Sequence, residues 1–276
     1  MSLSSAAGDH LFVLSTLSGP RRRFFVGVAA AVGVILAVLA VGLLRDEALD
    51  TGRVPVILVH GYGGSSSSMS QLAGALRATG REVVQLDLPD RGEGDIDGSA
   101  RALSQAVGST SAARVDLVGH SAGGVVIRAY LKDFGGTERA GTVVTLGSPH
   151  HGTTLADFAA SAGPEACVDA CAQLGRGSDF LAALNSGDET PGAAAYFSVW
   201  TAIDETVTPP DSAVLAGAVN IRVQDVCRGA QIGHGDLADD PLAIGLVLWA
   251  LKSPGDEPGP SDCARIQALG TGALNS

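Results

Sequence analysis

From Val54 onward, short apolar runs alternate with longer stretches in which apolar residues recur at helical spacing. The short runs have the length of buried strands, and the longer stretches have the length of helices that pack on them. We predict strands at Val54–Val59, Glu82–Leu86, Arg114–Val118, Thr142–Leu146, Ala195–Thr201 and Val219–Val223. We predict helices at Ser67–Thr79, Ser99–Val107, Gly123–Phe134, Ser178–Leu184, Pro210–Leu215 and Pro241–Leu251. This alternation is typical of the α/β class, here a mostly parallel open sheet of about six strands with helices on both faces.

A different pattern precedes this region. An unbroken apolar stretch runs from Phe24 to Leu44 and follows three arginines, Arg21 to Arg23. At about 1.5 Å per residue, this stretch is long enough to cross a bilayer core of about 30 Å. The arginines predict a cytoplasmic N-terminus, with everything after the stretch on the outer side. We expect an uncleaved anchor. A cleaved signal is the alternative, because Val38 and Ala40 have the spacing of a cleavage site and the arginines resemble a twin-arginine export signal.

The four cysteines all lie beyond the apolar stretch, where this topology predicts an oxidising environment. Four cysteines can form two disulfides in three ways. We favour Cys167 with Cys171 and Cys227 with Cys263, because a four-residue spacing brings the first two within bridging distance. The second bridge would tie the tail at 253–276 to the body. A zinc site is the competing interpretation, but the chain has no C-x-x-C pair.

Composition adds limits on the partners. The chain has 276 residues, 46% of them apolar and 17% charged, which allows one full-sized domain and an N-terminal appendage. We place the appendage, a cytoplasmic tail with a transmembrane or signal-anchor segment, at 1–50 and the domain at 51–276. The formal net charge is −11, and the only basic run is at 21–23. Such a surface does not displace the counterions of a phosphate backbone, so we do not expect nucleic acid as a partner.

The third predicted strand leads into the motif that carries chemistry, Gly119-His120-Ser121-Ala122-Gly123, and a helical pattern follows it. This is the G-x-S-x-G pattern of a nucleophile elbow, a sharp strand-to-helix turn that lifts a serine above the sheet. Glycine on either side leaves room for the turn. The position between a strand and a helix favours a real elbow over a chance match, so Ser121 is the candidate nucleophile.

A serine of this kind needs a carboxylate and then a histidine later in the chain, at the carboxyl ends of later strands. Asp204 follows the strand predicted to end at Thr201, and His234 follows the last predicted strand. We assign His234 as the general base and Asp204 as the acid that orients it. Asp225 and Asp236 are the rival acids. Asp225 lies at the end of the last predicted strand, which is the wrong place in the expected order of nucleophile, acid and base. Asp236 is too near His234 in sequence for the two side chains to approach each other easily.

The first predicted strand ends in a glycine-rich turn, His60-Gly61-Tyr62-Gly63-Gly64. We predict that the backbone N–H groups of Tyr62 and Ala122 form an oxyanion hole, in which each donor contributes about 3–4 kcal/mol. This chemistry requires no metal and no cofactor. Four further residues are candidates for lining the pocket: His60, His120, His151 and Met69. For His151, hydrogen bonding within its loop is the alternative.

Taken together, these segments resemble secreted bacterial lipases and esterases of the α/β-hydrolase fold, the group called lipase class 2. The resemblance spans roughly Val54 to Leu251. It is carried by VILVHGYGG, VDLVGHSAGG, VVTLGSPHHGT, the aspartate that ends FSVWTAID and the histidine of IGHGDLADDP. It implies that 51–276 is a catalytic domain that hydrolyses carboxylic esters, commonly acylglycerols. The stretch 151–192 is longer than in small members and forms either a lid or an ordinary crossover.

We therefore expect a lipase or esterase with an ester or lipid substrate. Its catalytic domain is expected to be anchored on the outer side of a membrane, or secreted if the apolar stretch is cleaved. An acyltransferase or a thioesterase that uses the same three residues is an alternative, and so is a non-catalytic binding protein that keeps the fold.

Overall fold

The computed structural model describes residues 54–163 and 165–276. The anchor expected at 24–44 lies outside the described residues. Among the helices of the described part, none combines the length and the apolar composition needed to cross a bilayer.

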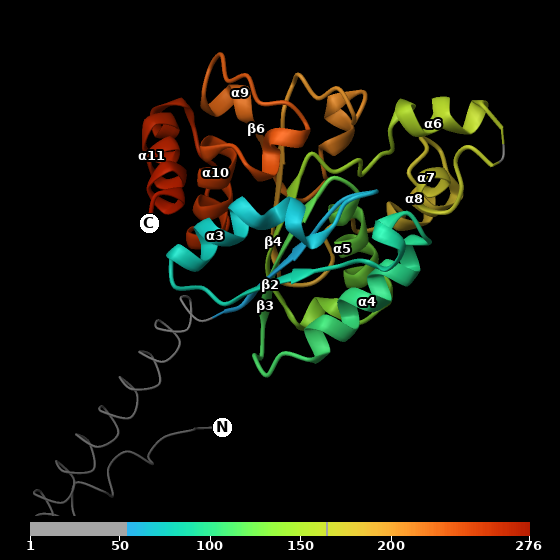
Figure 1. The fold of residues 1–276 in the computed structure, drawn as a ribbon, viewed down its shortest axis with the longest axis horizontal. Helices are drawn as coiled ribbons and strands as arrows, with labels where there is room; N and C mark the ends of the chain where they lie inside the picture. The colour runs from blue at the N-terminus through green and yellow to red at the C-terminus, as the bar shows by residue number, and fades with distance from the viewer. Residues whose placement is uncertain (1–53, 164) are drawn as a thin grey trace, which may run out of the picture. The chain divides into compact units, whose positions relative to one another are not determined.

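Six parallel strands form one sheet in the order β2-β1-β3-β4-β5-β6 (Figure 1). The strands are β1 (Val56–Val59), β2 (Val83–Leu86), β3 (Val115–His120), β4 (Ala140–Leu146), β5 (Ala195–Trp200) and β6 (Val219–Arg222). All six predicted strands are present, and their ends differ from the prediction by at most two residues. Val59 of β1 pairs with Gly119 of β3, and His120 pairs with Leu146 of β4. The loops after these strands therefore emerge side by side at one edge of the sheet.

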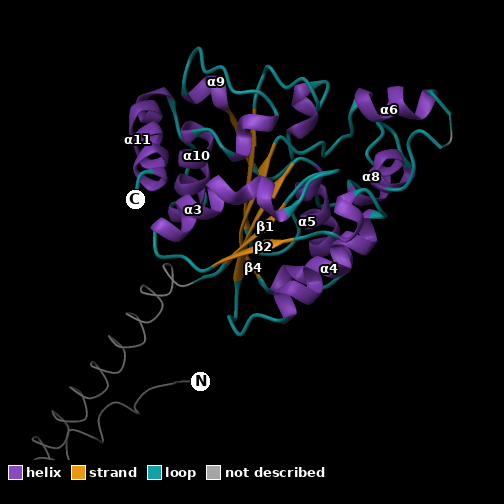
Figure 2. Ribbon diagram, viewed as in Figure 1, coloured by secondary structure: helices purple, strands orange, loops and turns teal. Residues whose placement is uncertain are grey.

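Helices cover both faces of the sheet, as Figure 2 shows. The helices on one face are α3 (Ser70–Ala78), α10 (Pro241–Lys252) and α11 (Cys263–Leu274). Those on the other face are α4 (Ile96–Gly108), α5 (Ala122–Asp133) and α8 (Asp179–Leu184). Burial from both sides explains why β1 is continuously apolar, and every one of its residues is fully buried. The predicted α/β class with a six-stranded parallel sheet is confirmed.

One predicted helix is wrong. Pro210–Leu215 is a single 3₁₀ turn at Pro210–Ala213, and the chain is extended again at Val214. Two consecutive prolines provide no backbone N–H, and the N–H groups of Ser212 and Val214 donate to acceptors three residues back. The remaining predicted helices are present, although the first begins as a 3₁₀ turn at Ser66–Met69.

Within residues 54–163 and 165–276, four α-helices were not predicted. They are α6 (Thr154–Ser161), α7 (Ala170–Gln173), α9 (Val223–Val226) and α11. The first three are too short to show a helical period. The last contains glycines, which lower helix propensity, and one of them is needed for packing. A Cβ on Gly270 would lie 1.7 Å from the carbonyl oxygen of Pro241, so α10 and α11 approach closely only with glycine there.

The structure contains both disulfides that the sequence favoured, Cys167–Cys171 and Cys227–Cys263. The second joins the residue after α9 to the first residue of α11. Ile266 of α11 is fully buried in the core. The bridge and this side chain together hold the C-terminal tail on the body of the domain.

Candidate active site

Ser121 lies in the turn between β3 and α5 and has φ 55° and ψ −128°. This backbone conformation is unfavourable for a residue with a side chain, by about 1–3 kcal/mol. Close backbone contacts around the turn support it. A Cβ on Gly119 would lie 2.6 Å from the carbonyl carbon of Gly123, and a Cβ on Gly123 would lie 2.3 Å from the carbonyl oxygen of Val59. The G-x-S-x-G segment therefore forms a sharp turn that only glycine at both positions permits.

We expect Gly123→Ala to lower the free energy of unfolding by about 3 kcal/mol or more, because the new methyl group presses on backbone oxygens of Val59 and His60. Backbone atoms in a central strand cannot swing aside as a flexible side chain can. Gly98→Ala in α4 is the matched control, since its Cβ meets no atom within 4 Å. It should raise stability by about 0.5 kcal/mol. Urea unfolding followed by circular dichroism measures both, and equal midpoints for the two variants would contradict the expectation.

The structure brings the three predicted triad side chains together. His234 Nε2 lies 2.9 Å from Ser121 Oγ, and His234 Nδ1 lies 2.8 Å from Asp204 Oδ2. Because an ionised carboxylate only accepts, Nδ1 carries the proton and Nε2 is free to accept from the serine hydroxyl. The other carboxylate oxygen of Asp204 accepts from the N–H groups of Thr206, at 2.9 Å, and Val207, at 2.7 Å. Asp204 and His234 are both buried, so solvent competes little for these bonds.

Gly147, the residue after β4, makes room for the acid and the base. Its φ is 55°, and a Cβ there would lie 3.2 Å from both Asp204 Oδ2 and His234 Nδ1. It would also lie 2.7 Å from Leu237. Sequence reasoning missed Gly147. The available signal was its place directly after a predicted strand, at the same edge of the sheet as Ser121.

His120 supports the base through its backbone. Its Nε2 lies 3.0 Å from the carbonyl oxygen of His234, and the two ring centroids are 5.0 Å apart. Since a carbonyl only accepts, Nε2 of His120 carries the proton. Burial, and next the neighbouring His234, lower the pKa of His120 to about 4. The ring is therefore neutral at neutral pH and places no charge beside the base. The side chain of Glu205 accepts from the N–H of His234 at 3.2 Å.

The predicted oxyanion-hole residues border the nucleophile. The N–H of Gly64 donates to the carbonyl of Gly61 and closes a tight turn that does not use the N–H of Tyr62. This turn packs on the serine, since a Cβ on Gly61 would lie 2.8 Å from Ser121 Cβ. Ala122 is the first residue of α5, where N–H groups have no acceptor within the helix. The two donors therefore lie on the segments that flank the serine, and their role stays a prediction.

A cavity of about 290 Å³ opens beside Ser121. Its lining is mostly apolar and includes Tyr62, Ala156 and Ala159 of α6, and Cys171 of α7. An apolar cavity that meets a nucleophile suits the apolar part of a substrate. The stretch 151–192 thus forms one wall, and its movement as a lid stays a prediction. In the part of the chain that the structure describes, no cluster of three or more His, Cys, Asp or Glu is arranged to hold a metal ion.

The four residues predicted to line the pocket lie elsewhere. Met69 is fully buried in the core against the sheet. His60 is also buried, and its Nε2 accepts from the N–H of Leu88 at 3.1 Å while its Nδ1 faces the carbonyl of Gly61. His120 contacts the backbone of the base rather than the cavity. Buried hydrogen bonds or apolar packing therefore hold these side chains away from the substrate space, although each lies near a motif in sequence.

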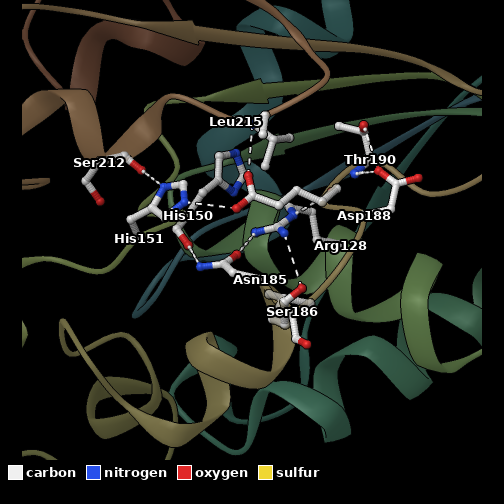
Figure 3. A network of polar contacts seen from close by, with 12 residues as sticks. Arg128, His150, His151, Asn185, Ser186, Asp188, Thr190, Ser212 and Leu215 are labelled. Carbon is white, nitrogen blue, oxygen red and sulfur yellow. Dashed lines mark hydrogen bonds and ion pairs between the residues drawn. The ribbon is translucent and has the colours of Figure 1, made fainter.

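His151, the fourth, lies in the loop that follows β4 and belongs to a polar network (Figure 3). Its Nε2 lies 3.1 Å from a carboxylate oxygen of Glu189. Arg128 of α5 donates to Asn185 Oδ1 at 2.8 Å, and Asn185 donates to the carbonyl of His150 at 2.9 Å. Burial lowers the pKa of Arg128 to about 10, so its guanidinium stays charged at neutral pH. The network ties the loop after β4, which lines the cavity, to α5 and to the end of α8.

Known proteins share this architecture. The chain is 30% identical over 142 residues to a triacylglycerol lipase of Burkholderia plantarii, a match that covers 48% of this chain and 39% of that protein. A triacylglycerol lipase of Pseudarthrobacter phenanthrenivorans is 31% identical over 117 residues, or 38% of this chain and 36% of that protein. The chain thus spans less than half the length of these relatives. The solved structure of Aspergillus fumigatus lipase B matches with a TM-score of 0.65 at 23% identity, over 81% of this chain and 62% of that chain, and shows the α/β-hydrolase fold.

A family model described as palmitoyl protein thioesterase matches residues 55–198, just over half of the chain. The matched range contains the glycine-rich turn, the Ser121 elbow and the helices α6 and α7 that wall the cavity. With the lipase relatives, this match confirms the resemblance to lipases and esterases. The chain therefore belongs to the palmitoyl protein thioesterase family and is of the lipase and esterase type within the α/β-hydrolase fold.

Proposed function

We propose that the protein is a serine carboxylic ester hydrolase that acts on acylglycerols or other apolar esters through Ser121, Asp204 and His234. One observation carries this proposal. A continuous path of hydrogen-bonding contacts runs from Ser121 Oγ through both nitrogens of His234 to Asp204, with distances of 2.9 and 2.8 Å. The apolar cavity beside the serine and the triacylglycerol lipase relatives favour apolar esters.

In this mechanism, His234 Nε2 takes the proton of Ser121 Oγ as the oxygen attacks the ester carbonyl carbon. The N–H groups of Tyr62 and Ala122 stabilise the negative oxygen of the tetrahedral intermediate, by about 3–4 kcal/mol each. His234 then gives the proton to the departing alcohol, and the acyl group stays on the serine. A water molecule repeats these steps on the acyl-enzyme and releases the carboxylic acid. Asp204 stays ionised throughout and stabilises the charged imidazole.

A thioesterase is the second candidate, because the matching family model is described as palmitoyl protein thioesterase. The same residues would perform the same two half-reactions with a thiol in place of the alcohol. A thiolate departs more readily than an alkoxide, so the first half-reaction would depend less on proton donation by His234. An acyltransferase would differ only in the second half-reaction, where an acceptor alcohol replaces water.

The test uses purified protein with a fluorophosphonate probe and with a matched pair of octanoyl substrates, a p-nitrophenyl ester and a thioester. We expect covalent labelling of the wild type, none of Ser121→Ala, and release of free octanoate with a larger kcat/KM for the ester. A larger kcat/KM for the thioester would favour the second candidate. Equal lack of labelling in the wild type and in Ser121→Ala would contradict both and favour a non-catalytic protein.

A further inference from the structure

We propose that His120 and Glu205 are positioning residues that hold the backbone of the base, His234, from two sides. His120 holds the carbonyl group of His234, and Glu205 holds its N–H group. This pair, the backbone clamp, places the imidazole at the distance from Ser121 that proton transfer needs. The inference rests on the proposed ester hydrolase function, in which His234 is the base, and adds two residues that affect the reaction only through that base.

The base lies in a loop that needs support from outside. Ile232 and Leu237 are buried in the core and anchor the two ends of this loop. Between them, His234 has Gly233 and Gly235 as neighbours, and glycine restricts the backbone less than any other residue. A Cβ on Gly235 would meet no atom within 4 Å, so packing does not confine the chain at that residue. The position of the base is therefore set by contacts to its own backbone and side chain.

The contact to the acid does not set this position alone. Asp204 Oδ2 lies 2.8 Å from His234 Nδ1 and fixes the direction of the ring. One hydrogen bond to a ring leaves the Cα atom free to shift and the ring free to follow it. A displacement of about 1 Å in an active site can cost a factor of about 100 in rate. The distance of 2.9 Å from His234 Nε2 to Ser121 Oγ therefore depends on how the backbone of the base is held.

Both peptide groups beside the base are held by side chains that follow other strands. Nε2 of His120 donates to the carbonyl oxygen of His234 at 3.0 Å. The carboxylate of Glu205 accepts from the N–H of His234 at 3.2 Å. The N–H of Leu237 donates to the same carbonyl at 3.4 Å, so His120 makes the shorter of the two bonds to it. Because peptide groups are planar, holding one on each side of the Cα atom restricts both of its backbone torsions.

The two clamp residues adjoin the other two triad residues on rigid parts of the domain. His120 is the last residue of β3, where it is paired with β4, and it precedes Ser121. Glu205 follows Asp204, whose Oδ1 accepts from the N–H groups of the two residues after Glu205 and closes a turn around it. Gly233 leaves room for the contact, since a Cβ there would lie 3.3 Å from a carboxylate oxygen of Glu205. The clamp therefore ties the base to the chain segments of the nucleophile and of the acid.

The first test measures kcat and KM for p-nitrophenyl octanoate in Glu205→Ala and Glu205→Gln. Alanine removes the acceptor of the His234 N–H, so kcat should fall about tenfold to a hundredfold. KM should stay within about twofold, because Glu205 is not among the residues that line the cavity. Glutamine keeps an oxygen acceptor and loses only the charge, so Glu205→Gln should recover most of the rate. Glu257→Ala, at an exposed glutamate between α10 and α11, is the matched control and should behave as the wild type.

The second test addresses the other half of the clamp in the same assay. His120→Phe keeps a ring beside the base and removes the N–H donor, so kcat should again fall about tenfold or more with little change in KM. His120→Gln supplies an N–H group at a similar reach and should be faster than His120→Phe. Thermal unfolding of all variants separates a loss of position from a loss of fold. If His120→Phe does not fold, His120→Asn replaces it, since its shorter amide does not reach the carbonyl.

The outcomes keep this inference separate from the proposed function. If the wild type hydrolyses the ester and Ser121→Ala does not, a kcat of Glu205→Ala within about twofold of the wild type overturns the clamp alone. An equal loss in Glu205→Gln and Glu205→Ala also overturns it, because the carboxylate would then act through its charge and not as an acceptor. A loss at only one of the two positions does the same. No hydrolysis of any ester by the wild type overturns the proposed function.

Discussion

Replacing Ser121 with alanine should lower kcat for p-nitrophenyl octanoate by roughly five to six powers of ten, the loss seen when a triad serine is removed. The alanine has no oxygen to attack the ester, so no acyl-enzyme forms. A small rate should remain, because backbone donors at Tyr62 and Ala122 would still stabilise the tetrahedral intermediate formed by direct attack of water. The measurement is the steady-state rate at neutral pH, with active-site concentration from fluorophosphonate titration of the wild type.

His234 Nε2 lies 2.9 Å from Ser121 Oγ, so a double variant can test whether the two side chains act together. If the two side chains act as a unit, His234→Ala should cost nearly as much as Ser121→Ala, and the double variant should be no slower than either. Ser68→Ala, at an exposed serine, is the control and should retain full activity. Losses that multiply in the double variant would mean that the two residues act independently and would contradict the assigned mechanism.

The strands and the order of the site residues could be predicted from the sequence, for physical reasons. A sheet buried on both faces needs apolar residues at consecutive positions, so the runs around Val56–Val59 and Val143–Leu146 were recognisable. In a parallel sheet, the carboxyl ends of the strands meet at one edge. Residues that follow strands far apart in the chain, such as Ser121 and His234, could therefore be placed near one another before any coordinates were known.

The wall of the cavity could not be predicted from the sequence in the same way. The short helix α7 has too few turns for a helical pattern, and its position depends on bonds from Gln173 to Asp95 and Ile96, more than seventy residues earlier. Only the folded chain brings these groups together.

The direction in which a side chain points next to a motif could not be predicted from the sequence either. His60 lies in the glycine-rich turn, yet it points to the N–H of Leu88 and not to the substrate space. The membrane anchor at 24–44 stays a prediction.

The second large effect on kcat is expected when Asp204, the acid that orients His234, is replaced. Asp204→Asn should lower kcat by about four powers of ten while leaving the fold intact. The N–H groups of Thr206 and Val207, which now bond Oδ1, require an oxygen at that position. The amide of the variant must therefore turn its NH₂ group toward His234 Nδ1. That nitrogen then accepts instead of donating, the ring proton moves to Nε2, and Nε2 can no longer take the proton of the serine.

Asp225→Asn is the control for this variant, because Asp225 was one of the two rival acids in the sequence. Its carboxylate is exposed and pairs with Arg222 three residues away, and it takes no part in the hydrogen bonds of Ser121, Asp204 or His234. Exposed pairs of this kind contribute about 0–1 kcal/mol, so kcat should stay within about twofold of the wild type. Thermal unfolding of both variants shows whether a loss of rate is a loss of fold. A nearly full rate in Asp204→Asn, or a large loss in Asp225→Asn, would show that another carboxylate orients His234, and the protonation state assigned to the base would be wrong with it.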